Sequence, residues 1–301
     1  MKLKALLNID RRIIYLIMLL SVIIPLVAKL DLPTKVTSEV ESIFNAIEAL
    51  QGTGKAVLIS IDYDPSTAPE LHPMSKAVMR HAMLRRIPVL GITLLPQGIG
   101  MGVDALGTTA REYGAKSLED YVFLGFQTPP LSVMLGLGED IRRVFPETYD
   151  KVPTDTIPLL ERIKNYDDIG LTISISGTSI PMSWVATAGT RFNQPVAAGV
   201  TAVSAADLYP FLQTNQLVGM MGGVKGGAEY EELLDRLEAR LGTAEQRFAA
   251  MTAEDAAMYK TDRYMARQIM NPQSIAHLTI IAFVLLGNVG YLLTERGRKR
   301  G

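Results

Sequence analysis

Polar side chains follow the apolar runs of this sequence, and the richest group follows the first run, at 56–61. Asp62 and Asp64 come directly after it, then Ser66. Two carboxylates one residue apart could bind a divalent cation through oxygen ligands, or one could act as a general base. Alternatively, such side chains cap turns and helix starts. Asp62 and Asp64 are therefore candidate metal ligands, with a structural role as the alternative.

Other polar residues stand at the ends of the later apolar runs. In an open parallel sheet, ligands bind outside the carboxyl ends of the strands, so side chains from separate loops meet there. The further candidates for this edge are Gln97, Gln127, Ser176, Thr178 and Ser179. With the first loop, they are expected to form the floor of a ligand-binding site.

Two glycine-containing segments resemble nucleotide-binding motifs but fail on context. Gly100-x-Gly102-x-x-Ala105 follows an apolar run and precedes a helical pattern, as a dinucleotide fingerprint does. The acidic residue expected after the next strand is missing, because that strand ends at Gln127. The phosphate-loop-like segment at 52–55 precedes its strand and lacks a hydroxyl residue after the lysine. We therefore assign no cofactor and predict no catalytic residues.

A glycine-rich segment at 219–227 has two interpretations. Its glycines are Gly219, Gly222, Gly223, Gly226 and Gly227. On a helix they would line one face and let another helix approach closely, although each costs about 1 kcal/mol relative to alanine. In a loop they would expose backbone N–H groups to an anion, with Lys225 adding charge. We favour a packed helical stripe, within the domain or across a subunit boundary.

Strand and helix patterns alternate through the middle of the chain. The strand patterns are short apolar runs at 56–61, 88–95, 121–126, 171–175 and 195–200. The helical patterns lie at 36–50, 71–86, 101–113, 131–144, 157–165 and 181–192. Strands that are apolar on both faces are typical of parallel sheets covered by helices. The sequence predicts an α/β fold with a mostly parallel five-stranded sheet, Rossmann- or flavodoxin-like.

Beyond Ser204, a plausible helix N-cap, the patterns become helical only. Helices are predicted at 205–212, 228–241 and 244–270. These segments are rich in Ala, Glu, Arg and Met, and the last one leads toward a C-terminal apolar stretch. The predicted divisions are therefore an α/β domain at 33–204 and a helical tail or stalk at 205–272.

Two apolar stretches, 13–28 and 275–293, stand at opposite ends of the chain. A helix rises about 1.5 Å per residue and a bilayer core is about 30 Å thick, so each stretch is near spanning length. The first could also begin a secretory signal peptide. The residues after Ala28 lack a small-x-small cleavage step, so we favour an uncleaved anchor. We predict transmembrane helices at 13–32 and 273–294.

Flanking charges predict the orientation. The outer flank of each apolar stretch carries basic residues, at 2, 4, 11 and 12 and at 296, 298, 299 and 300, whereas the inner flanks mix basic with acidic residues. Basic flanks stay preferentially in the cytoplasm. This predicts cytoplasmic tails at 1–12 and 295–301, a location in the cytoplasmic membrane and an extracytoplasmic domain. A net charge of −1 argues against a nucleic-acid partner, and the absence of cysteine fits several compartments.

Three segments together resemble a family of membrane-anchored α/β proteins of bacteria and archaea. The first is Asp-Tyr-Asp-Pro-Ser-Thr-Ala-Pro-Glu from Asp62, the second is Asn-Tyr-Asp-Asp-Ile from Asn165, and the third is Gly-Val-Thr-Ala-Val-Ser from Gly199. The glycine-rich segment adds to the resemblance. The resemblance implies an anchored α/β plan and no activity.

The missing catalytic set and the two anchors predict a structural or interaction subunit. It would oligomerise, or scaffold a membrane complex, with the lipid bilayer and copies of itself or other membrane subunits as partners. The alternative is a ligand- or metal-binding domain, possibly enzymatic, that uses the strand-end loops.

Overall fold

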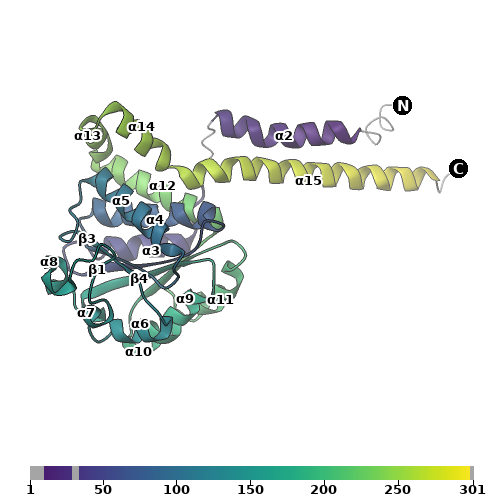
Figure 1. Ribbon diagram of the computed structural model, residues 1–301. Helices are drawn as coiled ribbons and strands as arrows, with labels where there is room; N and C mark the ends of the chain where they lie inside the picture. Colours follow the sequence, from purple (N-terminus) through teal and green to yellow (C-terminus); the bar gives the residue numbers. More distant parts are fainter. Residues whose placement is uncertain (1–9, 29–33, 299–301) are drawn as a thin grey trace. The chain divides into compact units, whose positions relative to one another are not determined.

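The structure is a computed structural model that describes residues 10–28 and 34–298 (Figure 1). The chain divides into two units, and each is described by itself. One unit is the α/β domain at 34–266, and the other consists of the terminal segments on either side of it.

The α/β domain is built on one sheet of six parallel strands. The strands are β1 (Ala56–Asp62), β2 (Val89–Thr93), β3 (Tyr121–Phe126), β4 (Ile169–Ser176), β5 (Val196–Val200) and β6 (Met220–Gly222). Their spatial order is β3-β2-β1-β4-β5-β6, so the chain builds one half outward from β1 and then crosses to β4 to build the other half. The predicted α/β class and parallel sheet are confirmed. The predicted count of five strands is wrong.

Long helices cover one side of the sheet. They are α3 (Ser38–Glu48), α4 (Ala68–Leu84), α5 (Gly98–Tyr113) and α12 (Gly223–Leu241). Their apolar residues form one core with alternate residues of the strands, such as Ile59 and Ile173. We call this side the long-helix side; Figure 1 shows its helices together on one face of the sheet.

Short helices cover the other side. They are α6 (Pro130–Leu137), α7 (Ile141–Val144), α8 (Pro158–Arg162), α9 (Ile180–Trp184), α10 (Thr190–Phe192) and α11 (Ala205–Gln213), with single turns η1 (Thr154–Thr156), η2 (Tyr166–Asp168) and η3 (Val185–Gly189). Their core includes Leu58, Leu160 and the only tryptophan, Trp184, which is fully buried. This is the short-helix side. The helix predicted at 131–144 is interrupted because Asp140 caps α7 by accepting a hydrogen bond from the Arg142 N–H.

The glycine-rich segment is not one helix. It passes through β6 and then starts α12, and Gly223 at the junction has a left-handed φ of +61°. Three residues are too few to show a strand pattern, which is why β6 was missed. The prediction that only helices follow Ser204 is wrong for the same reason. Ser204 occupies the N-cap position of α11, as expected, but its side chain makes no capping hydrogen bond and lies 3.0 Å from the Thr201 hydroxyl.

The glycines of this segment pack inside the chain. A Cβ atom added at Gly219 would lie 2.2 Å from the Glu39 carbonyl oxygen, and one at Gly226 would lie 2.7 Å from the Met221 Cα. Added Cβ atoms at the other glycines of the segment would meet Ala202, Ala205 or Ala266 at 2.8–3.2 Å. Close packing is therefore present, between elements of one chain.

After α12 the domain continues through α13 (Thr243–Ala249) and α14 (Ala253–Asp262), and the chain then enters α15 (Met265–Arg298). Near the N-terminus lies α2 (Arg11–Ala28). Both α2 and the 265–292 part of α15 are long and apolar enough to span a membrane, and only 6% of the apolar window of each is buried by the chain. This property indicates membrane association. The predicted domain boundaries stay predictions. Residues 29–32 of the first predicted span, residue 33 of the predicted domain, and residues 1–9 and 299–301 of the predicted tails lie outside the described residues.

Candidate functional site

Asp62 ends β1, and its side chain is fully buried. Leu58 belongs to the short-helix core and Ile59 to the long-helix core, so strand alternation places Asp62 on the short-helix side. Its Oδ1 accepts a hydrogen bond from the Leu94 N–H at 2.6 Å, and its Oδ2 accepts one from the Ser60 hydroxyl at 2.6 Å. Burial raises the pKa of Asp62 to about 7, although these hydrogen bonds oppose the rise.

Asp64 has the structural role that the sequence analysis gave as the alternative to metal binding, which is to cap a turn. Its Oδ1 accepts hydrogen bonds from the Ser66 N–H at 2.8 Å, the Ser66 hydroxyl at 2.6 Å and the Thr67 N–H at 3.2 Å. These bonds lower the pKa of Asp64 and close the turn that leads into α4. Asp62 and Asp64 share no hydrogen-bond partner among the described residues. Nor do those residues contain a group of three His, Asp or Glu side chains that could hold a metal ion.

Ser176 ends β4 and stands in register beside Asp62. Its hydroxyl donates to the Asp62 carbonyl oxygen at 3.0 Å and accepts from the Thr178 N–H at 3.0 Å. Ser60 is likewise in register with Ser174, whose buried hydroxyl has no hydrogen-bond partner in the described part of the chain. Ser60, Asp62, Ser174 and Ser176 form what we call the strand-end cluster, at the point where the strand order reverses.

The remaining predicted site residues stand apart from this cluster. Gln127 donates its amide N–H to the Val144 carbonyl oxygen at 3.1 Å, and its amide oxygen accepts from the Thr128 N–H. Gln97 and Ser179 are exposed at the starts of α5 and α9. No hydrogen bond joins Gln97, Gln127 or Ser179 to the strand-end cluster within the described residues. The structure thus brings together Asp62, Ser176 and Thr178 only.

A chain of ionisable side chains on the long-helix side, mostly buried apart from the 54% exposed Asp104, was missed by the sequence reasoning. It starts on α4 with His72, whose Nε2 lies 2.8 Å from Asp104 on α5 and whose Nδ1 lies 3.0 Å from the Tyr63 hydroxyl. Lys76 follows one turn later, and its Nζ lies 3.0 Å from both Asp104 and Asp262. Burial lowers the pKa of His72, and the positive charge of Lys76 adds to this effect.

Arg80 continues the chain of charges one further turn along α4. Its Nε donates to Glu112 at 2.6 Å, and its Nη2 donates to Asp262 at 2.6 Å. Arg80 is only 1% exposed, and Glu112 is equally enclosed. Burial works against the charged guanidinium, but the two carboxylates outweigh it and raise the pKa of Arg80. The two ion pairs of Arg80 therefore join α4 to α5 and to α14 inside the protein.

The far end of the same network fastens the helices after α12. Arg247 of α13 lies 2.9 Å from Glu238, and its guanidinium carbon lies 4.2 Å from the Tyr113 ring centroid. Arg263 contacts both Glu238 and Asp235 of α12. We call the whole set the buried-charge network; its members are His72, Lys76, Arg80, Asp104, Glu112, Asp235, Glu238, Arg247, Asp262 and Arg263. The spacing of His72, Lys76 and Arg80 by four residues is the signal that could have revealed it.

Helix α12 also binds both ends of the domain. Near the first end, Glu229 accepts hydrogen bonds from the Thr37 N–H at 2.8 Å and the Thr37 hydroxyl at 2.5 Å. At the other end, Glu231 accepts from the Ala266 N–H at 2.9 Å. Both glutamates are at least 97% buried, with exposed fractions of 1% and 3%. We call Thr37, Glu229, Glu231 and Ala266 the α12 clasp.

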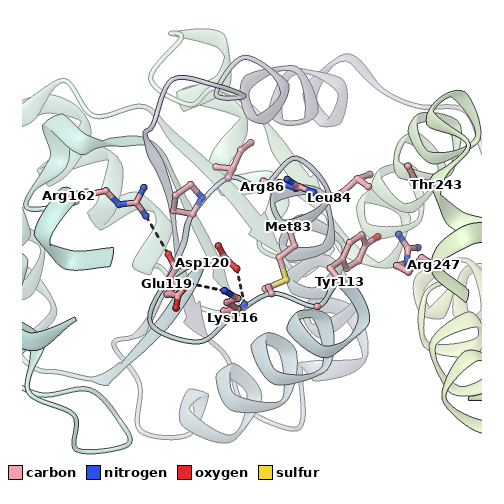
Figure 2. A pocket seen from close by; sticks show the side chains of 14 residues that line it. Met83, Leu84, Arg86, Tyr113, Lys116, Glu119, Asp120, Arg162, Thr243 and Arg247 are labelled. Atoms are coloured by element: carbon pink, nitrogen blue, oxygen red, sulfur yellow. Dashed lines mark hydrogen bonds and ion pairs between the residues drawn. The ribbon is translucent and has the colours of Figure 1, made fainter. Parts of the chain in front are cut away.

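A cavity lies at the opposite edge of the sheet from the strand-end cluster. It has a volume of about 600 Å³ and adjoins the residues that precede β2 and β3, including Pro88 and Asp120. Figure 2 shows basic side chains around it, among them Arg86 and Arg162. No sequence motif marked this edge.

The chain matches no family model, no curated protein and no solved structure. The resemblance to membrane-anchored α/β proteins therefore stays a prediction, and the function has to be argued from the geometry of this chain.

Proposed function

We propose that this chain is a membrane-anchored interaction subunit, whose α/β domain assembles with copies of itself or with other membrane subunits. The apolar helices α2 and α15 support the anchoring. The α12 clasp is the observation that carries the proposal, because it ties the chain segments that lead toward both apolar helices to one helix of the domain.

The α12 clasp favours a rigid connection, and not a flexible one, between the α/β domain and the segments that lead toward the apolar helices. Hydrogen bonds to a charged group contribute about 1.5–3 kcal/mol each, and leaving such a group buried without its partner costs more. Glu229 and Glu231 therefore hold Thr37 and Ala266 in fixed positions. The buried-charge network reinforces α14, which directly precedes α15. A domain fixed at two points is suited to holding an assembly in a defined orientation.

The orientation that we propose follows the basic flanks. With cytoplasmic ends at 1–12 and 295–301, the α/β domain lies outside the cytoplasmic membrane. The chain contains no cysteine, so one introduced cysteine is a unique label. Val203 is 87% exposed on the α/β domain and is a suitable position. In intact cells with any outer barrier opened, a membrane-impermeant maleimide is expected to label Val203→Cys and not Gly301→Cys; the reverse pattern would contradict the orientation.

Assembly is tested by the mass of the purified protein. Size exclusion with light scattering in mild detergent is expected to give one discrete oligomer whose mass does not change on dilution. A stable monomer, together with failure to retain any membrane protein after cross-linking in the native membrane, would refute the proposal. Gly223→Leu is not a useful interface variant here, because a side chain at a φ of +61° would strain the fold.

Ligand binding at the strand ends is the second candidate, and the strand order favours it. The order 3-2-1-4-5-6 is the order of doubly wound, Rossmann-like domains, which bind ligands where the order reverses. The strand-end cluster stands at this point. A rise in melting temperature with Mg²⁺ or Ca²⁺ that disappears in Asp62→Asn, which removes the carboxylate of the strand-end cluster, would support the metal-binding version. If no divalent cation shifts the melting temperature of the wild-type chain, that version fails.

A further inference from the structure

The cavity at the amino-terminal edge of the sheet collects side chains from elements far apart in the sequence. Arg86 comes from the turn between α4 and β2, Lys116 from the turn between α5 and β3, and Arg162 from α8. Thr243 and Arg247 come from α13. Figure 2 shows Arg162 on one side, Arg247 on the other and Lys116 between them. The volume of about 600 Å³ lies within the range of small-molecule sites.

The cavity is lined by two carboxylates, Glu119 and Asp120, and by four cations, Arg86, Lys116, Arg162 and Arg247. Two of the cations keep free donors. Arg86 is exposed, and its guanidinium makes no ion pair with any described residue. Arg162 donates one N–H to the Glu119 carbonyl oxygen at 3.4 Å, and Lys116 pairs with the Glu119 carboxylate at 3.3 Å. A guanidinium presents five N–H donors, so Arg86 and Arg162 retain most of theirs.

The wall beside these charges is apolar and includes an aromatic ring. Met83, Ile87, Pro88 and Ala115 line it together with Tyr113. The Tyr113 hydroxyl is already bonded to Glu238 at 2.5 Å, and the Arg247 guanidinium lies over one face of the ring, 4.2 Å from its centroid. Only the part of the ring that Arg247 does not cover remains for contact with a ligand. An apolar wall next to unpaired guanidinium groups suits a ligand with an apolar body and an anionic group.

Two polar atoms at the α13 side of the cavity have no partner. The Thr243 hydroxyl and the Arg247 Nε are both buried and make no hydrogen bond within the described residues. Buried polar groups are nearly always paired with protein, water or ligand. Both atoms lie beneath the surface of the α13 wall, so this wall holds hydrogen-bonding capacity that the described residues leave unused.

We propose that this cavity binds a small organic anion, with Arg86 and Arg162 contacting its phosphate or carboxylate group and the Tyr113 wall contacting its apolar body. The site joins the α/β core to α13. A bound ligand therefore adds contacts between α13 and the turns before β2 and β3.

Phenyl phosphate is the probe that combines both parts of the expected ligand. Isothermal titration of the full chain in non-ionic detergent, at constant ionic strength, is expected to show saturable binding. Inorganic phosphate lacks the apolar body and phenol lacks the charge, so each is expected to bind at least about tenfold more weakly, which corresponds to about 1.4 kcal/mol. Benzoate distinguishes the two anion classes: binding comparable to phenyl phosphate assigns the site to carboxylates as well as phosphates, and weaker binding to phosphates alone.

Variants locate the binding in this cavity. Arg86→Gln and Arg162→Gln are each expected to weaken phenyl phosphate binding about tenfold or more. Arg143→Gln is the matched control, since Arg143 is an exposed arginine outside the cavity, and its affinity is expected to be unchanged. Trp184 fluorescence melting checks that every variant is folded. The proposal is overturned if wild-type protein shows no saturable binding up to about 10 mM, well above a 1 mM dissociation constant, or if Arg143→Gln loses as much affinity as the cavity variants.

Discussion

The two sides of the sheet are built on different physical principles. The short-helix side is held by apolar packing around Trp184, and its helices have at most nine residues. The long-helix side has an apolar core of its own and, around it, the buried-charge network and the α12 clasp. Charges are thus buried on the side whose helices lead to the ends of the domain.

This difference assigns separate tasks to the two sides. The hydrophobic effect that drives apolar packing is non-directional. Paired buried charges require defined partners at defined positions, because a charge that loses its partner in the interior is costly. We infer that the long-helix side fixes α13, α14 and the ends of the domain in one arrangement, while the short-helix side supplies stability.

The largest effect is expected from Arg80→Met. The substitution removes the Arg80 hydrogen bond from buried Glu112 and leaves Asp262 with Lys76 alone, so the free energy of unfolding is expected to fall by roughly 3–5 kcal/mol. Urea unfolding followed by Trp184 fluorescence measures the fall. Adding Glu112→Gln and Asp262→Asn should restore part of the loss, because it removes the carboxylates that Arg80 no longer neutralises. A loss below about 1 kcal/mol would show that the network does not hold the long-helix side together.

Leu160→Ala makes the corresponding change on the short-helix side. Leu160 is fully buried, and its truncation leaves a cavity that is expected to lower the free energy of unfolding by roughly 2–4 kcal/mol. The same urea experiment measures the loss. In contrast to Arg80→Met, the loss should be the same from about pH 5 to about pH 8, because no ionisable group is unpaired. A loss that varies with pH would contradict the account of Leu160 as a purely apolar contact.

Asp62→Asn tests the one buried carboxylate on the short-helix side. The folded pKa of about 7 lies above the ordinary value of 3.8, so the native state holds a proton that the unfolded state releases. Stability from this group is therefore present at low pH and lost as the pH rises toward 7, by about 1 kcal/mol per pH unit between about pH 5 and about pH 7. The amide removes this slope.

The control for Asp62→Asn is Asp64→Asn. Asp64 has a lowered pKa, so its contribution is lost only as the pH falls below about 4, and the slope between pH 5 and pH 7 should persist in this variant. Urea midpoints at several pH values give both profiles. Parallel profiles for wild type and Asp62→Asn would refute the assignment.

The smallest effect is expected from Arg236→Met on the long-helix side. Arg236 pairs with Glu232 one turn away at 2.9 Å, and its side chain is 59% exposed. Exposed pairs of this spacing contribute about 0.3–0.5 kcal/mol. The change also matches Arg80→Met in chemistry, so the ratio of the two losses in urea compares a buried arginine that joins two other helices with a surface arginine that pairs within its own helix. If Arg80→Met and Arg236→Met lower the free energy of unfolding by similar amounts, the proposed difference between buried and surface charges is wrong.

The sheet could largely be predicted from the sequence, and its exceptions have local causes. Strand β3 matches its prediction residue for residue, because its apolar run is sharply bounded. Strand β6 was missed because three residues carry no periodicity, and its glycines were consistent with a helix. The helix predicted at 181–192 contains a π turn at η3, which apolar spacing does not distinguish from α-helix.

The site was less predictable, because its decisive contacts are long-range. The register between Asp62 and Ser176 follows from the strand-end rule. The partners of Arg80 lie 32 and 182 residues away along the chain. Contacts between residues so far apart cannot be predicted from local sequence patterns. The lining of the cavity comes from α4, α5, α8, α13 and the turns before β2 and β3. Sequence spacing could show that charges share a face of α4, but not that this face is buried.

The α12 clasp has a mechanical consequence. Glu229 and Glu231 are two residues apart, about 200° around the helix. They therefore accept hydrogen bonds from Thr37 and Ala266 on nearly opposite sides of α12. A pulling force on either end of the domain acts first on the hydrogen bonds from Thr37 and Ala266 to α12. Helix α12 would therefore carry the force before it reaches the strands of the sheet.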